Sequence, residues 1–136
     1  MSQDIRDFVK PVNELLALGE PTHREPAFGW VRNELFAQLV EGGFRSIALE
    51  IDRVAAFVVD DFVREGVGSF DAVMRDGFSH GWGDLEPNRA LVGWLRDYNR
   101  ARPSHERVSF HGFDGQTENT TAPSPRRYLE HARDYL

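Results

Sequence analysis

Hydrophobic residues recur at helical spacing in several stretches of the chain. The apolar positions of the clearest stretch are Phe28, Val31, Leu35, Phe36 and Leu39, and Gly42-Gly43 follows them. Because an apolar stripe every three to four residues is typical of an amphipathic helix, and glycine commonly ends one, we expect a helix over 26–41. The same reasoning predicts helices over 53–64, over 69–76 after a capping Ser69, from Pro87 to before Pro103, and from Pro125 to Leu136.

Between these stretches lie short, nearly continuous apolar runs. They cover about residues 15–19, 46–51 and 108–112. Such runs suit strands that are covered on both faces, as in parallel sheets. Strands alternating with helices predict an α/β protein, with a parallel sheet of three strands in a three-layer fold and helices on its faces. A weak helical stretch over 1–13, broken at Pro11, is expected to cap the first strand.

The start of the first long helix can be interpreted in two ways. Thr22 and Glu25 fit a capping box, which would place His23 in the first turn. Alternatively, Pro26 occupies the first helical position and His23 lies in the preceding loop.

Each predicted strand is followed by an acidic residue. Glu20, Glu50 and Asp114 occupy these positions, His23 follows the first strand and His111 lies near the end of the third. In open parallel sheets, ligands bind beyond the carboxyl ends of the strands. The sequence therefore predicts a functional site at this edge, although polar residues are also ordinary in loops.

Arg32 lies in the middle of the apolar stripe of the first long helix. Because burying an unpaired guanidinium costs several kcal/mol, we expect Arg32 to meet a carboxylate, with Glu50 or Glu20 as the candidates. The alternative is that its stem packs while its charged head reaches water.

His23 is the best candidate for a general base. Imidazole titrates near neutral pH, and a neutral ring held by Glu20 could take a proton from water or a hydroxyl. His80, in the glycine-rich aromatic stretch 77–83, and His111 are weaker candidates. Glu20, His23, Glu50 and His111 are suitable metal ligands by type, but their spacing specifies no metal site. The sequence contains no glycine-rich phosphate loop.

Composition narrows the possible functions. The 136 residues carry a net charge of -6 and no basic patch stands out, which argues against nucleic acid as a partner. The absence of cysteine excludes a disulfide framework and a thiol nucleophile. The charged first ten residues lack the apolar core of a secretion signal, and no apolar run is long enough to span a membrane. We therefore expect a cytoplasmic protein that has neither a membrane nor a nucleic acid as its partner.

Several segments together resemble the erythromycin esterase family. They are Leu18-Gly19-Glu20-Pro21-Thr22-His23, then Arg32, the segment 43–50, Glu86, the segment 94–99 and Phe110-His111-Gly112-Phe113-Asp114. The resemblance extends from about Leu15 to Leu136, in the order of the family and with similar spacing. It implies an α/β hydrolase of carboxylic esters, since some members open macrolide lactone rings.

The resemblance also implies roles for individual residues. The motif histidine of the family, His23 here, is the general base that activates water, the motif glutamates fall on Glu20 and Glu50, and the helix arginine falls on Arg32. We expect these four to be catalytic. The residues that we expect to bind the substrate are His80, Glu86, His111 and Asp114. We expect no cofactor and no metal, and the expected partner is a small ester or lactone.

This chain departs from the family pattern in two ways. A small residue usually follows the motif histidine, whereas this chain has Arg24, Glu25 and Pro26. The family domain also continues beyond the length seen here and contributes a second functional histidine. We therefore expect residues 1–136 to be the N-terminal part of the family domain, completed by a missing C-terminal half or in a homo-oligomer. The competing hypotheses are a non-catalytic remnant that binds a small molecule and a metal-dependent enzyme.

Overall fold

The computed structural model describes residue 9, residues 14–115 and residues 124–136. The helix expected over 1–13 lies almost entirely outside these residues. The elements follow one another along the chain as α1 (Pro26–Glu41), β1 (Ser46–Asp52), α2 (Ala56–Glu65), α3 (Phe70–Asp76), the short 3-10 turn η2 (Trp82–Asp84), α4 (Glu86–Arg100), the 3-10 turn η3 (Ser104–Glu106), β2 (Ser109–Asp114) and α5 (Arg126–Tyr135).

The caps of the helices follow from the sequence. Pro26 opens α1, and the Glu25 carboxylate accepts a hydrogen bond from the Ala27 backbone N–H at 3.2 Å. The second interpretation of this helix start is therefore confirmed, and His23 lies in the loop before it. Ser69 caps α3 as expected, because its hydroxyl accepts from the Ala72 N–H. α2 begins at Ala56, later than expected, because residues 53–55 form a turn.

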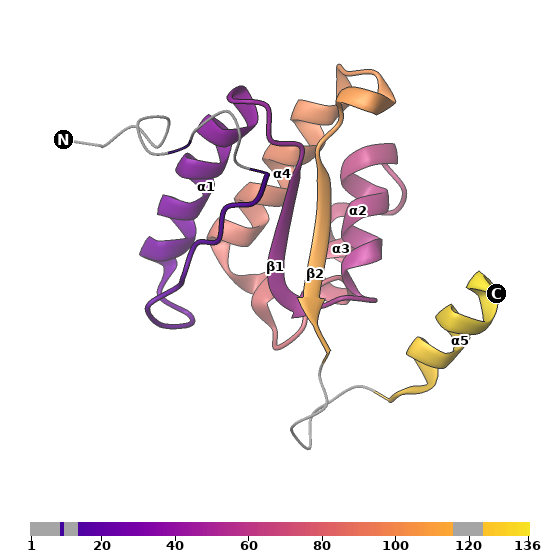
Figure 1. Cartoon of the computed structure of the whole chain (residues 1–136). Coiled ribbons are helices and arrows are strands. Elements are labelled where there is room, and N and C mark those ends of the chain that lie inside the picture. The colour runs from indigo at the N-terminus through magenta and orange to yellow at the C-terminus, as the bar shows by residue number, and fades with distance from the viewer. Residues whose placement is uncertain (1–8, 10–13, 116–123) are drawn as a thin grey trace.

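β1 and β2 form a parallel pair (Figure 1). Ile47 lies opposite Phe110, Leu49 opposite Gly112, and the register shifts before Asp52 meets Asp114. A Cβ atom on Gly112 would lie 2.6 Å from the Ile51 carbonyl oxygen, so the close approach of the two backbones at this shift requires glycine. The α/β class and the parallel sheet are thus confirmed.

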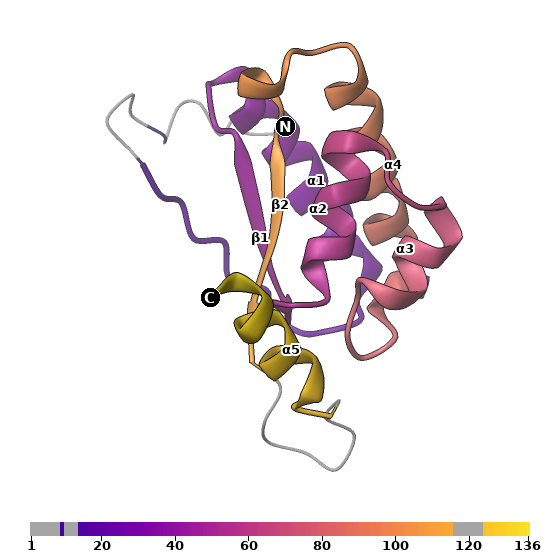
Figure 2. The same cartoon turned by 90° about the vertical axis from the view of Figure 1, so that its right-hand side faces the viewer.

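The helices α1, α2, α3 and α4 lie on one side of the sheet (Figure 2). The core fills the space between them, and its largest fully buried apolar residues are Phe110, Ile51, Leu91, Leu95, Val40, Val59, Val63, Val73, Val92 and Val108. On the other side of the sheet, Ala48, Glu50 and Phe113 are exposed. The described residues therefore show one helical layer packed against the sheet, and the layer expected over the opposite face is not seen among them.

The strand predicted over 15–19 is not formed, and this prediction was wrong. This segment carries no sheet hydrogen bonds, and Leu15 is 85% and Leu18 48% exposed. A strand is held by the N–H and C=O groups of a neighbouring strand, and apolar composition alone does not supply that neighbour. The run therefore forms an extended segment that leads into the loop before α1.

The outer edge of β2 is covered by a side chain of α2. The Asp60 carboxylate accepts a hydrogen bond from the Phe110 backbone N–H at 2.8 Å. This contact satisfies a ladder group that would otherwise be free on an edge strand.

In the parts of the chain that the structure describes, no helix has both the length and the apolar composition that a membrane span requires.

Candidate functional site

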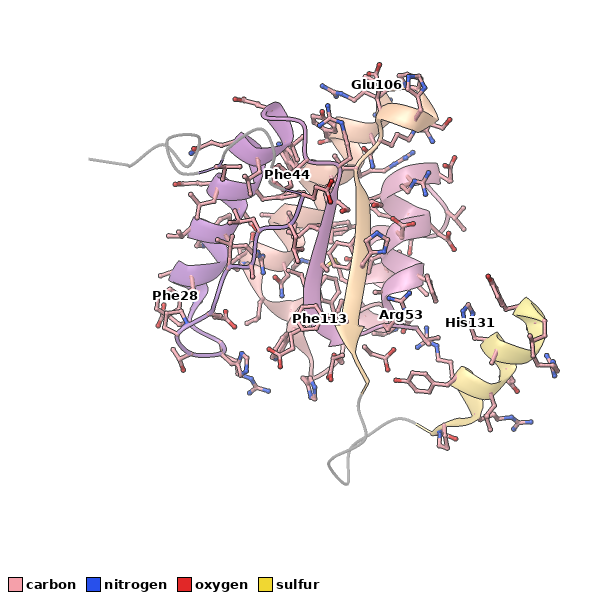
Figure 3. All side chains as sticks on the ribbon, viewed as in Figure 1. Phe28, Phe44, Arg53, Glu106, Phe113 and His131 are labelled. Carbon is pink, nitrogen blue, oxygen red and sulfur yellow. The ribbon has the colours of Figure 1, made fainter. Side chains whose placement is uncertain are left out.

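The candidate site lies at the carboxyl end of the sheet. Figure 3 shows Phe28, at the start of α1, and Phe113, near the end of β2, at the same end of the molecule. The loop after α3 also reaches this end, because the Ser79 hydroxyl accepts a hydrogen bond from the Asp52 backbone N–H at 3.1 Å. Three connections thus converge here: the loop before α1, the loop after α3 and the ends of the two strands.

Glu20 and His23 form a close acid–imidazole pair. The distance from His23 Nδ1 to Glu20 Oε2 is 2.9 Å, and the two side chains are 55% and 40% exposed. When the ring carries its proton on Nδ1, that proton is donated to the carboxylate and Nε2 keeps its lone pair. The pair expected from the sequence is therefore present, with geometry suited to a base.

The Trp82 indole lies beside two histidine rings. Its centroid is 5.1 Å from that of His23 and 5.6 Å from that of His80. Sequence reasoning identified 77–83 as an ordered aromatic loop but assigned no role to Trp82. Its only signal was the aromatic residue among glycines.

His80 connects this group to the end of β2. Its Nε2 atom lies 4.0 Å from Asp114 Oδ2. His80 and Arg24 both adopt a positive φ, of 57° and 63°, and Arg24 Nη2 donates to the His80 carbonyl oxygen at 3.4 Å. Because positive φ is costly for residues other than glycine, two such residues in contact mark a backbone held in place by its surroundings.

Arg32 is largely withdrawn from water, as expected, but its hydrogen-bond partners differ from the expected carboxylates. Its Nη2 donates at 2.9 Å to the amide oxygens of both Asn33 and Asn88, and its Nε donates to Asn33 at 3.2 Å. Burial lowers the pKa of the Arg32 guanidinium, and the Glu20 charge acts in the opposite direction. Glu20 therefore interacts with Arg32 through its charge, and amide oxygens supply the direct contacts.

Asp52 and Tyr128 were missed by sequence reasoning. Asp52, at the end of β1, is 3% exposed, and its carboxylate accepts from the Ala55 N–H at 2.7 Å and from the Tyr128 hydroxyl of α5. Burial, followed by the hydrogen bond to Asp52, raises the pKa of Tyr128 to about 12. An acid directly after an apolar strand was a usable signal for Asp52, whereas nothing in the sequence indicated that Tyr128 would reach it.

The remaining predicted residues are not gathered around His23. Glu50 is exposed on β1 and Glu86 is exposed in the first turn of α4. Among the described residues, neither forms a hydrogen bond or ion pair with His23 or Arg32. His111 is half-buried on β2, where its Nε2 lies 3.0 Å from the Ser109 hydroxyl.

The site is an open edge without a metal-binding arrangement. Within residues 14–115 and 124–136, no three His, Cys, Asp or Glu side chains are grouped so that they could hold a metal ion. A shallow hollow lies elsewhere, on α5, where it is lined by His131, Ala132, Tyr135 and Leu136.

Comparison with known proteins gives one match. Residues 39–136 match the family described as Erythromycin esterase. The matched region includes Glu50, His80, Glu86, His111 and Asp114, and it begins after Glu20, His23 and Arg32. Neither the curated proteins nor the solved structures contain a match to this chain.

Proposed function

Because this chain belongs to the erythromycin esterase family, we propose that its carboxyl edge hydrolyses a carboxylic ester, with the lactone of a macrolide as the first candidate substrate. The observation that carries the proposal is the contact of 2.9 Å between His23 Nδ1 and Glu20 Oε2. A carboxylate at one ring nitrogen leaves the other free to accept a proton, and this is the arrangement that a general base requires.

In the proposed reaction, His23 Nε2 removes a proton from a water molecule as its oxygen adds to the ester carbonyl. The tetrahedral intermediate then collapses, its bond to the alcohol oxygen breaks, and the proton on His23 passes to that oxygen. The products are a carboxylic acid and an alcohol. Glu20 stabilises the imidazolium while it exists. Arg32, which interacts electrostatically with Glu20, offsets negative charge on this side of the site.

The family match starts at residue 39, so the roles of Glu20, His23 and Arg32 depend on their geometry and on the resemblance of the motif. We propose them as the catalytic group. Glu50, which lies in the matched region, is proposed to contribute through its charge, and His80, Glu86, His111 and Asp114 are proposed to contact the substrate.

The test is replacement of His23. His23→Ala should lower the rate of erythromycin ring opening, measured by mass spectrometry as the gain of one water, by about 10²- to 10⁴-fold. Glu20→Gln should also lower the rate, because the amide no longer stabilises the imidazolium. His105→Ala is the matched control, since His105 is exposed in η3, which precedes β2 and is remote from the carboxyl ends of the strands. Full activity of His23→Ala would exclude the proposed base.

A second candidate function is binding of a small molecule without turnover. It is favoured by the exposure of both members of the pair, 55% for His23 and 40% for Glu20, because hydrolytic sites work best where bulk water is excluded. Calorimetric binding of erythromycin that leaves the macrolide intact after long incubation would support this alternative. Measurable ring opening that depends on His23 would reject it.

A further inference from the structure

The position of Trp82 is fixed by the short turn that it begins. The Trp82 backbone N–H donates to the Ser79 carbonyl at 3.0 Å, and the Trp82 carbonyl accepts from the Leu85 N–H at 3.2 Å. A Cβ atom on Gly83 would lie 1.8 Å from the Met74 carbonyl oxygen, so the turn packs directly against α3. The indole is therefore attached to backbone that cannot shift without disturbing a helix.

The two imidazoles beside this indole belong to residues that are more exposed than Trp82. His23 lies in a loop, and its side chain is more than half exposed. His80 lies in a turn, and its side chain is 31% exposed. An exposed histidine on a loop samples several side-chain rotamers, and a rigid ring packed against it removes part of that freedom.

The same turn is connected to Arg32. The Asn88 side chain donates from Nδ2 to the Trp82 carbonyl at 2.9 Å and accepts at Oδ1 from Arg32 Nη2 at 2.9 Å. Asn88 is 5% exposed, so both contacts are shielded from competing water. Trp82 thus contacts His23 and His80 through its ring, and reaches Arg32 through its backbone and Asn88.

We propose that Trp82 is a positioning residue that holds the imidazoles of His23 and His80 in fixed orientations at the carboxyl edge. For His23, the orientation is the one in which Nδ1 meets Glu20, and for His80 it is the one that directs Nε2 toward Asp114. The consequence for catalysis rests on the proposed function, whereas the orientation of the rings can be measured without any activity.

The primary test is imidazole nitrogen NMR on the full chain. In the wild type, the ¹⁵N shifts of His23 should report one dominant tautomer with the proton on Nδ1. Trp82→Leu removes the ring surface, so the His23 shifts should move toward the averaged values of a free histidine. Trp82→Phe keeps an aromatic face and should retain most of the wild-type tautomer population. The imidazole ¹⁵N shifts depend on which nitrogen carries the proton and on its hydrogen bond. They therefore distinguish a change in the orientation of the ring from the loss of the ring current of Trp82.

The chain supplies its own controls. Trp30→Leu removes a tryptophan that is 43% exposed on α1 and should leave the His23 and His80 signals unchanged. His111, whose Nε2 lies beside Ser109, should keep its signals in every variant. If the His23 tautomer is the same in Trp82→Leu as in the wild type, the proposal is overturned, because the ring then holds its orientation without the indole.

Kinetics provide a second readout. If the ester is hydrolysed, Trp82→Leu should lower kcat by on the order of 10²-fold, the cost of misplacing a catalytic group by about 1 Å, with a smaller change in KM. Trp82→Phe should recover most of the loss. A lowered kcat that Phe does not restore at all, in a folded protein, contradicts positioning by the ring face. An intact tautomer effect in a chain without esterase activity would support the role of Trp82 while rejecting the proposed function.

Discussion

The helix-facing side of the sheet and its carboxyl edge differ in how deeply their side chains are buried and in the kind of contact that they make. Facing the helices, Ile51, Val59 and Leu95 are fully buried, and their packing removes apolar surface from water. At the carboxyl edge, the side chains of His23 and Glu20 are 55% and 40% exposed, and a polar contact joins them. The difference shows that stability comes mainly from one region and the proposed chemistry from the other, so the two should respond separately to substitution.

Asn99 is a polar residue on the helix-facing side of the sheet. Asn99 of α4 is fully buried among apolar residues, where its amide donates to the Val63 and Val108 carbonyls and accepts from the Val108 N–H. Because all of these partners are backbone groups, Asn99 ties α4 and the end of α2 to the residue just before β2. It therefore belongs to the stabilising region despite its chemistry.

The largest expected loss of stability follows replacement of Phe110, and a second phenylalanine of β2 serves as its control. Phe110→Ala should lower the free energy of unfolding by about 3–5 kcal/mol, because Phe110 is 1% exposed and its loss leaves a cavity. Phe113→Ala is the matched control, since Phe113 is 63% exposed and its replacement should change stability by less than about 0.5 kcal/mol. Urea unfolding followed by circular dichroism measures both. Equal losses would mean that Phe113 is covered in solution.

A somewhat smaller loss is expected at Asn99. Asn99→Ala leaves the carbonyls of Val63 and Val108 and the N–H of Val108 without their side-chain partner, which should cost about 3 kcal/mol. Asp97→Ala, on the same helix but exposed, is the control and should be nearly neutral. The same urea titration measures the free energy of unfolding of both variants. If Asn99→Ala is as stable as the wild type, water replaces the hydrogen bonds of the amide.

The sequence predicted the helices of the stabilising region, because helices depend on periodicity and capping residues. The bounds of α1 were predicted from its apolar stripe and from Gly42-Gly43, and those of α3 from its Ser69 cap. The run 15–19 failed because strand formation needs a neighbour at the right distance, which composition does not encode. The covering of the β2 edge by Asp60 was also invisible, since it joins residues fifty positions apart.

The carboxyl edge was predicted only in part. Glu20 and His23 are three residues apart in one turn, so their contact was within reach of local reasoning. The contacts of Arg32 with Asn88, and of Trp82 with two histidines, join segments that are far apart in the chain. Side chains that bond to amides or stack on rings leave no charge pattern or period in the sequence. This is why carboxylates were expected around Arg32 and amide oxygens were found.

The smallest expected effect tests the contact between the edge and α5. In Figure 3, His131 of α5 is directed toward the body of the protein, where its ring centroid lies 4.8 Å from that of Phe57. The Tyr128 hydroxyl of the same helix donates to Asp52. Tyr128→Phe removes this hydrogen bond and should lower stability at neutral pH by about 1 kcal/mol. Tyr135→Phe, on the same helix and 86% exposed, should have no effect.

The pH dependence of this effect has a defined sign. In the folded protein the pKa of Tyr128 is raised to about 12, above the value of about 10 for an unfolded chain, so the folded state favours the neutral phenol. Its contribution to stability is therefore complete below about pH 10 and is lost as the pH rises toward 12, where a phenolate would face the Asp52 carboxylate. The difference in unfolding free energy between wild type and Tyr128→Phe should shrink over this range. A difference that stays constant would show that Tyr128 ionises no later than an ordinary tyrosine, and hence that α5 is not held at the edge by this bond.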